Sequence, residues 1–388
     1  MLPRPNANFI LPSLYNGIEL RTRIYFPKAR YDSTLGSDTP AVSGVAIFAH
    51  PYAPLGGSYD DPVVQLVGKQ VLAEHFLFVT FNFRGAEDSD GKTSWSARPE
   101  LADYVSVYVF ALALINNEDM DRFLARYHEV NNDSQQPLLL LGGYSYGSMI
   151  AAHLPNIDLP ARVLEKTQPG SAEHEIGLRA KELASMLKLY LERRQSKHRS
   201  NSRSEEEPPA AGGTFGGCES PQKVSHDARR SLHLNMRGSV DIVHRKLDRV
   251  SHSSNPRNLD FVSQPQNIVV PRLTYLLISP LLGPVSSLAV AFSSLKFERH
   301  FRSATAARDT PAADVQLALS SVPSLVVFGS HDQFTSAKKV RKWCESLAAL
   351  PKSKLEYQEI QHAGHFWFEA ENANKLQVAV SSWLKKLT

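Results

Sequence analysis

One stretch of the sequence, residues 137–153, constrains the fold more than any other. An apolar run of the length of a strand leads into Gly143-Tyr-Ser-Tyr-Gly147, and small and apolar residues follow as the start of a helix. In a G-x-S-x-G turn the serine lies on a strained strand-to-helix junction, so the residues two before and two after it must lack a side chain. The pentapeptide alone occurs by chance in many sequences, but its flanks predict Ser145 as a candidate nucleophile.

Strand-like and helix-like segments alternate along the rest of the chain. Asn8–Leu14 and Glu19–Phe26 alternate apolar with polar residues around a turn and predict an antiparallel hairpin at a sheet edge. Asp61 and Pro62 are typical of an N-cap and the first residue of a helix. Besides the strand before Ser145, we expect strands at 44–50, 76–83, 273–279, 324–329 and 354–360, and helices at 61–75, 100–115, 336–347 and 375–387. This alternation predicts an α/β fold with a mostly parallel, twisted sheet and helices on both faces.

The chain changes character after the helix that follows Ser145. Apolar residues recur at helical spacing from Ala172 to about Arg194 and predict an amphipathic helix. Residues 195–264 are rich in Ser, Arg, Asn, Pro and Gly, and we expect most of them to be disordered because they cannot bury enough apolar surface. We therefore expect a core of residues 1–160 and 265–388 with an insertion at 161–264. The amphipathic helix is either a lid over Ser145 or an appended helix packed away from it.

Composition excludes several classes of protein. Of the 388 residues, 42% are hydrophobic and 21% are charged, and the net charge of +4 is carried by residues 190–260, so nothing indicates a nucleic-acid-binding surface on the core. No segment reaches the apolar length of a membrane span, and prolines interrupt the N-terminal residues where a signal peptide needs an apolar run. The two cysteines, Cys218 and Cys344, exclude a disulfide framework and favour a reducing compartment, so we expect a cytoplasmic protein.

A serine hydroxyl is a weak nucleophile, so it needs a base within hydrogen-bond reach and a carboxylate that orients the base. Two loops after later strands offer these groups: Asp332 follows the strand at 324–329, and His365 follows the strand at 354–360. The order Ser, acid, His is the one expected when the serine lies on a G-x-S-x-G turn. His362 and His331 are alternative histidines on the same loops, and Asp103, inside a predicted helix, is an alternative acid.

Five motifs in this order resemble those of the serine α/β-hydrolase superfamily, and in particular the small predicted hydrolases with H-P-x-x-x-x-G-G, F-N-F-R-G, G-x-S-x-G, G-x-x-D and a terminal H-F-F/W. They lie here at residues 50–57, 81–85, 143–147, 329–332 and 365–367. The resemblance covers the chain from about Gly44 to the C-terminus, except roughly residues 160–271. It implies Ser145 as nucleophile, His365 as general base and then acid, and Asp332 as the orienting carboxylate, and the aromatic residue after His365 favours it over His362.

The oxyanion of an acyl-transfer reaction needs two backbone N–H donors. Tyr146, directly after Ser145, offers one, and the second is expected from the loop after the strand at 44–50. The prolines of that loop have no N–H, so Tyr52 is the first candidate and Ala53 the second.

The sequence thus predicts a serine hydrolase that cleaves an ester, thioester or related acyl substrate through an acyl-enzyme on Ser145. Two alternatives stay open: a non-catalytic relative used for binding or scaffolding, and a cyclisation or lyase reaction in the same pocket. No metal-ligand spacing or dinucleotide fingerprint is visible, so no cofactor or metal is expected, and the expected partner is a small acyl substrate rather than nucleic acid. The sequence contains nothing that supports a partner protein at the insertion.

Arg84 and the acidic residues 87–90 are either substrate contacts or a self-paired, solvated loop.

Overall fold

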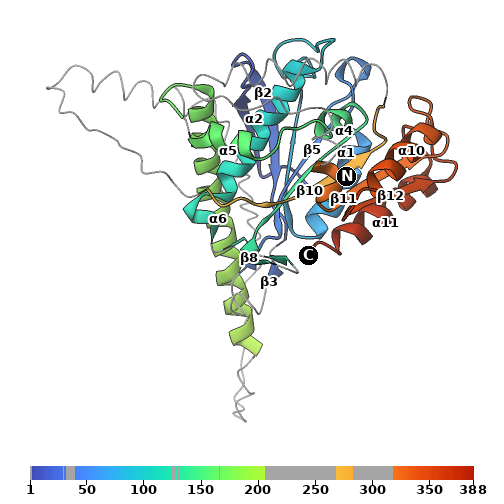
Figure 1. The fold of residues 1–388 in the computed structure, drawn as a ribbon. Helices are drawn as coiled ribbons and strands as arrows, with labels where there is room; N and C mark the ends of the chain where they lie inside the picture. The colour runs from blue at the N-terminus through green and yellow to red at the C-terminus, as the bar shows by residue number, and fades with distance from the viewer. Residues whose placement is uncertain are drawn as a thin grey trace, which may run out of the picture.

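An eight-stranded sheet in the order β1-β2-β6-β5-β9-β10-β11-β12 forms the centre of the protein (Figure 1). The computed structural model describes residues 2–28, 30–31, 40–121, 123–124, 127–129, 132–165, 167–205, 268–282 and 318–388. The strands are β1 (Ala7–Pro12), β2 (Glu19–Tyr25), β5 (Gly44–Ala49), β6 (Phe76–Phe81), β9 (Leu138–Tyr144), β10 (Arg272–Ile278), β11 (Ser324–Gly329) and β12 (Leu355–Ile360). Two short pairs, β3 (Arg30–Tyr31) with β4 (Pro40–Ala41) and β7 (Tyr127–Glu129) with β8 (Asn132–Gln136), lie outside this sheet.

The strand pairings confirm the predicted α/β class. β1 and β2 form the expected antiparallel hairpin, β2 pairs antiparallel with β6, and all other pairings in the main sheet are parallel. β10 lies between β9 and β11, so a strand from beyond the predicted insertion completes the sheet directly beside the strand that leads into Ser145. Strands β5, β6, β9 and β11 are buried along their whole length, which explains why nearly all of their residues are apolar or glycine.

Helices cover both faces of the sheet (Figure 1). Helices α1 (Pro62–Ala73) and α11 (Ala370–Leu384) bury their apolar side chains against one face. On the other face lie α2 (Arg98–Ile115), α6 (Ala172–Glu205) and α10 (Ala337–Ala348), with the shorter α3 (Glu118–Asp121), α4 (Tyr146–Ala151) and α5 (Asp158–Glu165). The predicted cap of α1 is confirmed, since the Asp61 carboxylate accepts the Val63 N–H at 2.8 Å and Pro62 is the first helical residue.

The amphipathic helix of the predicted insertion, α6, lies beside α2 (Figure 1) and also packs against α3 and β1. Its buried residues repeat at helical spacing: Ile176, Ala180, Leu183, Leu187 and Leu191. Lys188 forms an ion pair of 2.6 Å with Asp119, and the Tyr190 ring lies 5.3 Å from that of Phe26. These contacts attach the helix to the face of the sheet that α2 covers.

The same helix is longer than predicted, because it continues past Arg194 to Glu205. We expected disorder to begin at residue 195, since the composition there is strongly polar. Five of the eleven residues at 195–205 are Gln, Lys, Arg or Glu, which extend a helix at little cost once packing has formed its first turns, so polarity alone does not end it. The remainder of the predicted disordered segment, residues 206–264, lies outside the described residues.

Within the described part of the chain, no helix combines the length and the apolar character that crossing a bilayer requires.

Cys344 is a free, buried cysteine of α10, and burial raises the pKa of its thiol to about 12. Cys218 lies outside the described residues.

Candidate active site

The turn after β9 has the strained geometry that the glycine spacing predicts. Ser145 has φ 55° and ψ −114°, a conformation that costs a residue with a side chain about 1–3 kcal/mol. A Cβ atom on Gly143 would lie 2.3 Å from the carbonyl carbon of Gly147, and one on Gly147 would lie 2.5 Å from the carbonyl oxygen of His50. Strand and helix therefore pass too closely for either glycine to carry a side chain.

The structure brings Ser145, Asp332 and His365 together from the carboxyl ends of three parallel strands, β9, β11 and β12. The Nε2 atom of His365 lies 2.8 Å from Oγ of Ser145, and its Nδ1 atom lies 2.7 Å from Oδ2 of Asp332. An ionised carboxylate can only accept, so Nδ1 carries the ring hydrogen and Nε2 is left to accept the hydrogen bond of the Ser145 hydroxyl. In this arrangement the imidazole can remove the serine proton.

Neighbouring groups hold the acid and the histidine in place. Oδ1 of Asp332 accepts the N–H groups of Phe334 at 2.8 Å and Thr335 at 3.0 Å, which leaves Oδ2 for the imidazole. The backbone N–H of His365 donates to the Gln333 side chain at 3.2 Å, and the Tyr144 hydroxyl donates to the His365 carbonyl at 2.9 Å. Gln333 and Tyr144 are not among the predicted site residues, because the sequence marks them only by their adjacency to Asp332 and Ser145.

The three polar side chains are almost fully removed from solvent. The His365 and Asp332 side chains are 3% and 2% exposed, and Ser145 is 5% exposed. Charge–dipole interactions and hydrogen bonds are electrostatically stronger in such a dry site than in water. The burial therefore strengthens the interaction of an imidazolium with Asp332 when His365 takes up a proton.

Tyr146 and Tyr52, the two residues predicted to supply oxyanion donors, lie next to each other. Tyr146 is the first residue of α4, and the first N–H groups of a helix have no acceptor within it. Tyr52 directly precedes a 3₁₀ turn at Ala53–Leu55, and its ring centroid lies 5.2 Å from that of Tyr146. The loop folds back tightly, since a Cβ on Gly57 would lie 2.3 Å from the carbonyl oxygen of Pro51.

The sheet order, the strained serine after β9 and the trio at the strand ends occur together in one fold family. The chain has the α/β-hydrolase fold. No protein-family model matches the sequence, and no curated protein matches it.

Solved structures of α/β serine hydrolases and esterases are similar to the chain at low sequence identity. An α/β serine hydrolase homologue from Coxiella burnetii has a TM-score of 0.44 and 14% identity, over 98% of this chain and 99% of that one. XC6422 from Xanthomonas campestris, an α/β serine hydrolase without a lid, has a TM-score of 0.43 and 13% identity, over 100% and 96%. The esterase Pf2001 from Pyrococcus furiosus has a TM-score of 0.46 and 11% identity, over 98% and 91%.

The alternative histidines of this hydrolase fold do not contact Ser145. His331 and His362 lie edge to face with ring centroids 5.2 Å apart, and both are exposed. Of the histidines on the two loops, His365 is the one hydrogen-bonded to the serine hydroxyl. In the described segments, no cluster of three or more His, Cys, Asp or Glu side chains is arranged to hold a metal ion.

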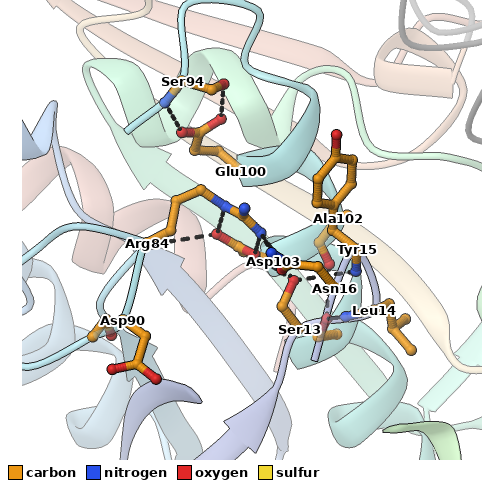
Figure 2. Close-up of polar contacts among 12 residues, drawn as sticks. Ser13, Leu14, Tyr15, Asn16, Arg84, Asp90, Ser94, Glu100, Ala102 and Asp103 are labelled. Atoms are coloured by element: carbon orange, nitrogen blue, oxygen red, sulfur yellow. Dashed lines mark hydrogen bonds and ion pairs between the residues drawn. The ribbon is translucent and has the colours of Figure 1, made fainter. Parts of the chain in front are cut away.

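Arg84 and Asp103 form a buried ion pair, which corrects both alternatives considered for Arg84 (Figure 2). The Arg84 guanidinium donates to Oδ1 of Asp103 at 2.6 Å and to Oδ2 at 2.9 Å, and the Ser13 hydroxyl donates to Oδ1 at 2.6 Å. The two side chains are 5% and 0% exposed, so the Arg84 guanidinium is neither solvated nor free for substrate. Asp103, the alternative acid, therefore pairs with Arg84, whereas His365 is hydrogen-bonded to Asp332. Figure 2 also shows the buried Glu100 carboxylate, which accepts the Ser94 hydroxyl at 2.6 Å.

His50 is a buried structural histidine at the base of the Tyr52 loop. Its Nε2 atom accepts the Phe83 N–H at 2.9 Å, so the hydrogen lies on Nδ1, which donates to the Pro51 carbonyl at 2.6 Å. Burial disfavours the imidazolium and lowers the pKa of His50 from 6.5 to about 4. The neutral ring thereby joins the loop that carries Tyr52 to the end of β6.

This geometry makes His50 a source of acid sensitivity. The pKa of His50 is lower in the folded state than its unfolded value of 6.5, so the stabilisation is complete above about pH 6.5 and is lost as the pH falls towards about 4. The difference between the two pKa values corresponds to about 3 kcal/mol. We expect the change in unfolding free energy between pH 7 and pH 4.5, measured with urea, to be smaller in His50→Gln than in the wild type. An equal pH dependence in the two proteins would contradict this assignment.

Proposed function

We propose that the protein is a serine hydrolase that cleaves an ester, thioester or related acyl substrate through an acyl-enzyme on Ser145. The observation that carries the proposal is the hydrogen-bonded series from Ser145 through His365 to Asp332, with heavy-atom separations of 2.8 Å and 2.7 Å. The strained turn at Ser145 supports it further, because backbone strain of this kind is concentrated at functional sites.

In the first half of the reaction, Oγ of Ser145 attacks the substrate carbonyl carbon while Nε2 of His365 takes up the hydroxyl proton. The carbonyl oxygen becomes an oxyanion that accepts the N–H groups of Tyr146 and Tyr52, and each such donor contributes about 3–4 kcal/mol to stabilising the transition state. Collapse of the intermediate breaks the bond to the leaving group, which receives the proton from Nε2. The product of this half is an ester between Ser145 and the acyl group.

In the second half, Nε2 of His365 accepts a proton from water, whose oxygen attacks the acyl-enzyme. The new tetrahedral intermediate uses the same two N–H donors, and its collapse returns the proton to Oγ of Ser145 and releases the carboxylic acid. Asp332 keeps the imidazole in the required tautomer and stabilises the imidazolium in both halves.

Labelling with a fluorophosphonate probe tests the proposal. We expect the folded wild type to be labelled and Ser145→Ala to be unlabelled. Ser148→Ala is the matched control, because Ser148 is a buried serine one turn further along α4 and should leave labelling intact. A folded wild-type protein that resists the probe would instead favour a binding or scaffolding role. Labelling at Ser145 without release of acid from any ester or thioester would favour the cyclisation or lyase alternative.

A further inference from the structure

Three phenylalanines with large exposed areas lie beside His365. Phe334, Phe366 and Phe368 are 50%, 44% and 81% exposed. The Phe334 and Phe366 ring centroids lie 4.5 Å and 5.5 Å from that of His365 and 5.6 Å from each other. Phe366 and Phe368 are stacked, with centroids 5.2 Å apart and an interplanar angle of 15°. These three residues, here called the phenylalanine rim, form a continuous aromatic surface from the His365 ring to solvent.

The rim is held in an outward orientation by the residue between two of its members. Trp367 has φ 56°, is buried, and donates its indole N–H to the Ser279 hydroxyl at 3.1 Å. Because Trp367 is anchored towards the core, Phe366 and Phe368 on either side of it face outward. Phe334 belongs to the other loop, and the Asp332 carboxylate accepts its backbone N–H at 2.8 Å.

Exposure of three adjacent phenylalanines is unfavourable unless something covers them. Burial of a phenylalanine side chain stabilises a folded state or a complex, and the fold leaves about half or more of each of these side chains available for burial by a ligand. Contiguous exposed apolar surface is commonly a binding site. The rim continues directly into the ring of His365, so its position points to a substrate rather than to a remote partner.

The chemistry of acyl transfer identifies which part of a substrate lies here. The carbonyl oxygen must face the N–H groups of Tyr146 and Tyr52, and the leaving group must lie within reach of Nε2 of His365, which gives it a proton. The leaving group is therefore on the histidine side of the scissile bond. That is the side on which Phe334 and Phe366 pack against the imidazole.

We propose that the phenylalanine rim binds a hydrophobic alcohol or thiol portion of the substrate and selects acyl compounds with an apolar leaving group. This inference rests on the proposed hydrolase function, since it needs a scissile bond at Ser145. It concerns the leaving group and not the acyl chain.

Two series of esters test the inference. The first keeps an acetyl group and compares methyl with 2-phenylethyl alcohol, and the second keeps methanol and compares acetyl with octanoyl. We expect Phe334→Ala and Phe366→Ala each to lower the ratio of kcat/KM for 2-phenylethyl acetate over methyl acetate by about tenfold. The octanoyl-to-acetyl ratio should not change. Phe366→Leu should retain most of the preference, and Val378→Ala, at an exposed apolar side chain of α11, is the control outside the rim.

The outcomes separate the rim from the proposed hydrolase function. A wild type that is not labelled by fluorophosphonate contradicts the hydrolase itself. If the protein is labelled and hydrolyses esters, but both alanine variants keep the wild-type ratio of kcat/KM for 2-phenylethyl over methyl acetate, the role of the rim is contradicted and the hydrolase function is not. The same holds if the alanine variants lower the octanoyl-to-acetyl ratio and leave the alcohol ratio unchanged. Binding of the wild type to phosphatidylcholine vesicles that is lost in Phe368→Ala, without a change in the alcohol ratio, would assign the rim to a lipid surface and overturn the inference.

Discussion

Replacing His365 with glutamine is expected to lower kcat for ester hydrolysis by about 10⁴- to 10⁶-fold. Glutamine can form hydrogen bonds at the same place, but it cannot take up the proton of Ser145 and return it to the leaving group. The Nε2 atom of His365 is the one hydrogen-bonded to the serine hydroxyl, so no other histidine of the two loops should compensate. The measurement is steady-state hydrolysis of p-nitrophenyl acetate by folded protein.

His362→Gln and His331→Gln are the matched controls, because these histidines lie on the same two loops and contact each other rather than the serine. Both should keep kcat within a few-fold of the wild type. A severe loss in His362→Gln with an active His365→Gln protein would reverse the assignment of the base.

Asp332→Asn extends the test to the acid. Its expected loss in kcat is about 10⁴-fold, because an amide can donate to Nδ1 of His365 and so favour the wrong tautomer. The protein should remain folded, since the amide oxygen of the substituted side chain would still accept the two backbone N–H groups that Oδ1 of Asp332 accepts.

The distribution of apolar and polar residues along the sequence predicts most of this fold, because it reflects which faces of each strand and helix are buried. Continuous apolar runs predict the buried parallel strands, and Asp61 with Pro62 predicts where α1 begins. The glycines two before and two after Ser145 predict the turn itself, since only a close backbone approach requires glycine at both places. These features are local, so a single sequence carries them.

Contacts between distant segments are not predicted in the same way. The apolar stripe of α6 indicates that one side of the helix is buried, but it does not identify the element on which the helix packs. The structure shows that this element is mainly α2. The Arg84–Asp103 pair joins a loop to a helix across 19 positions of sequence, a separation with no periodic signal. The sequence therefore leaves two alternatives for Arg84, a substrate contact or a solvated, self-paired loop, and the burial of the Arg84 side chain argues against both.

The buried Arg84–Asp103 ion pair is expected to have a large effect on the stability of the fold. Asp103→Ala is expected to lower the free energy of unfolding by about 3–5 kcal/mol, because it leaves the Arg84 guanidinium buried without its carboxylate. The Ser13 hydroxyl and the Arg84 backbone N–H lose the same acceptor. Urea denaturation followed by circular dichroism measures the change. The control is Asp60→Ala, which removes a carboxylate that is itself half exposed and pairs with the partly exposed Arg23, at an expected cost of about 0–1 kcal/mol.

A double variant distinguishes an unpaired charge from a simple loss of packing. Replacing Arg84 with methionine and Asp103 with leucine removes both charges while keeping similar volume, so the double variant should recover most of the stability lost in Asp103→Ala. If the double variant is as unstable as the single one, the hydrogen bonds to Ser13 and the backbone carry the effect. If Asp103→Ala is no worse than Asp60→Ala, the pair is not structural. Because Arg84 follows Phe83, whose N–H donates to His50, a shift of this pair would also reach the loop that carries Tyr52.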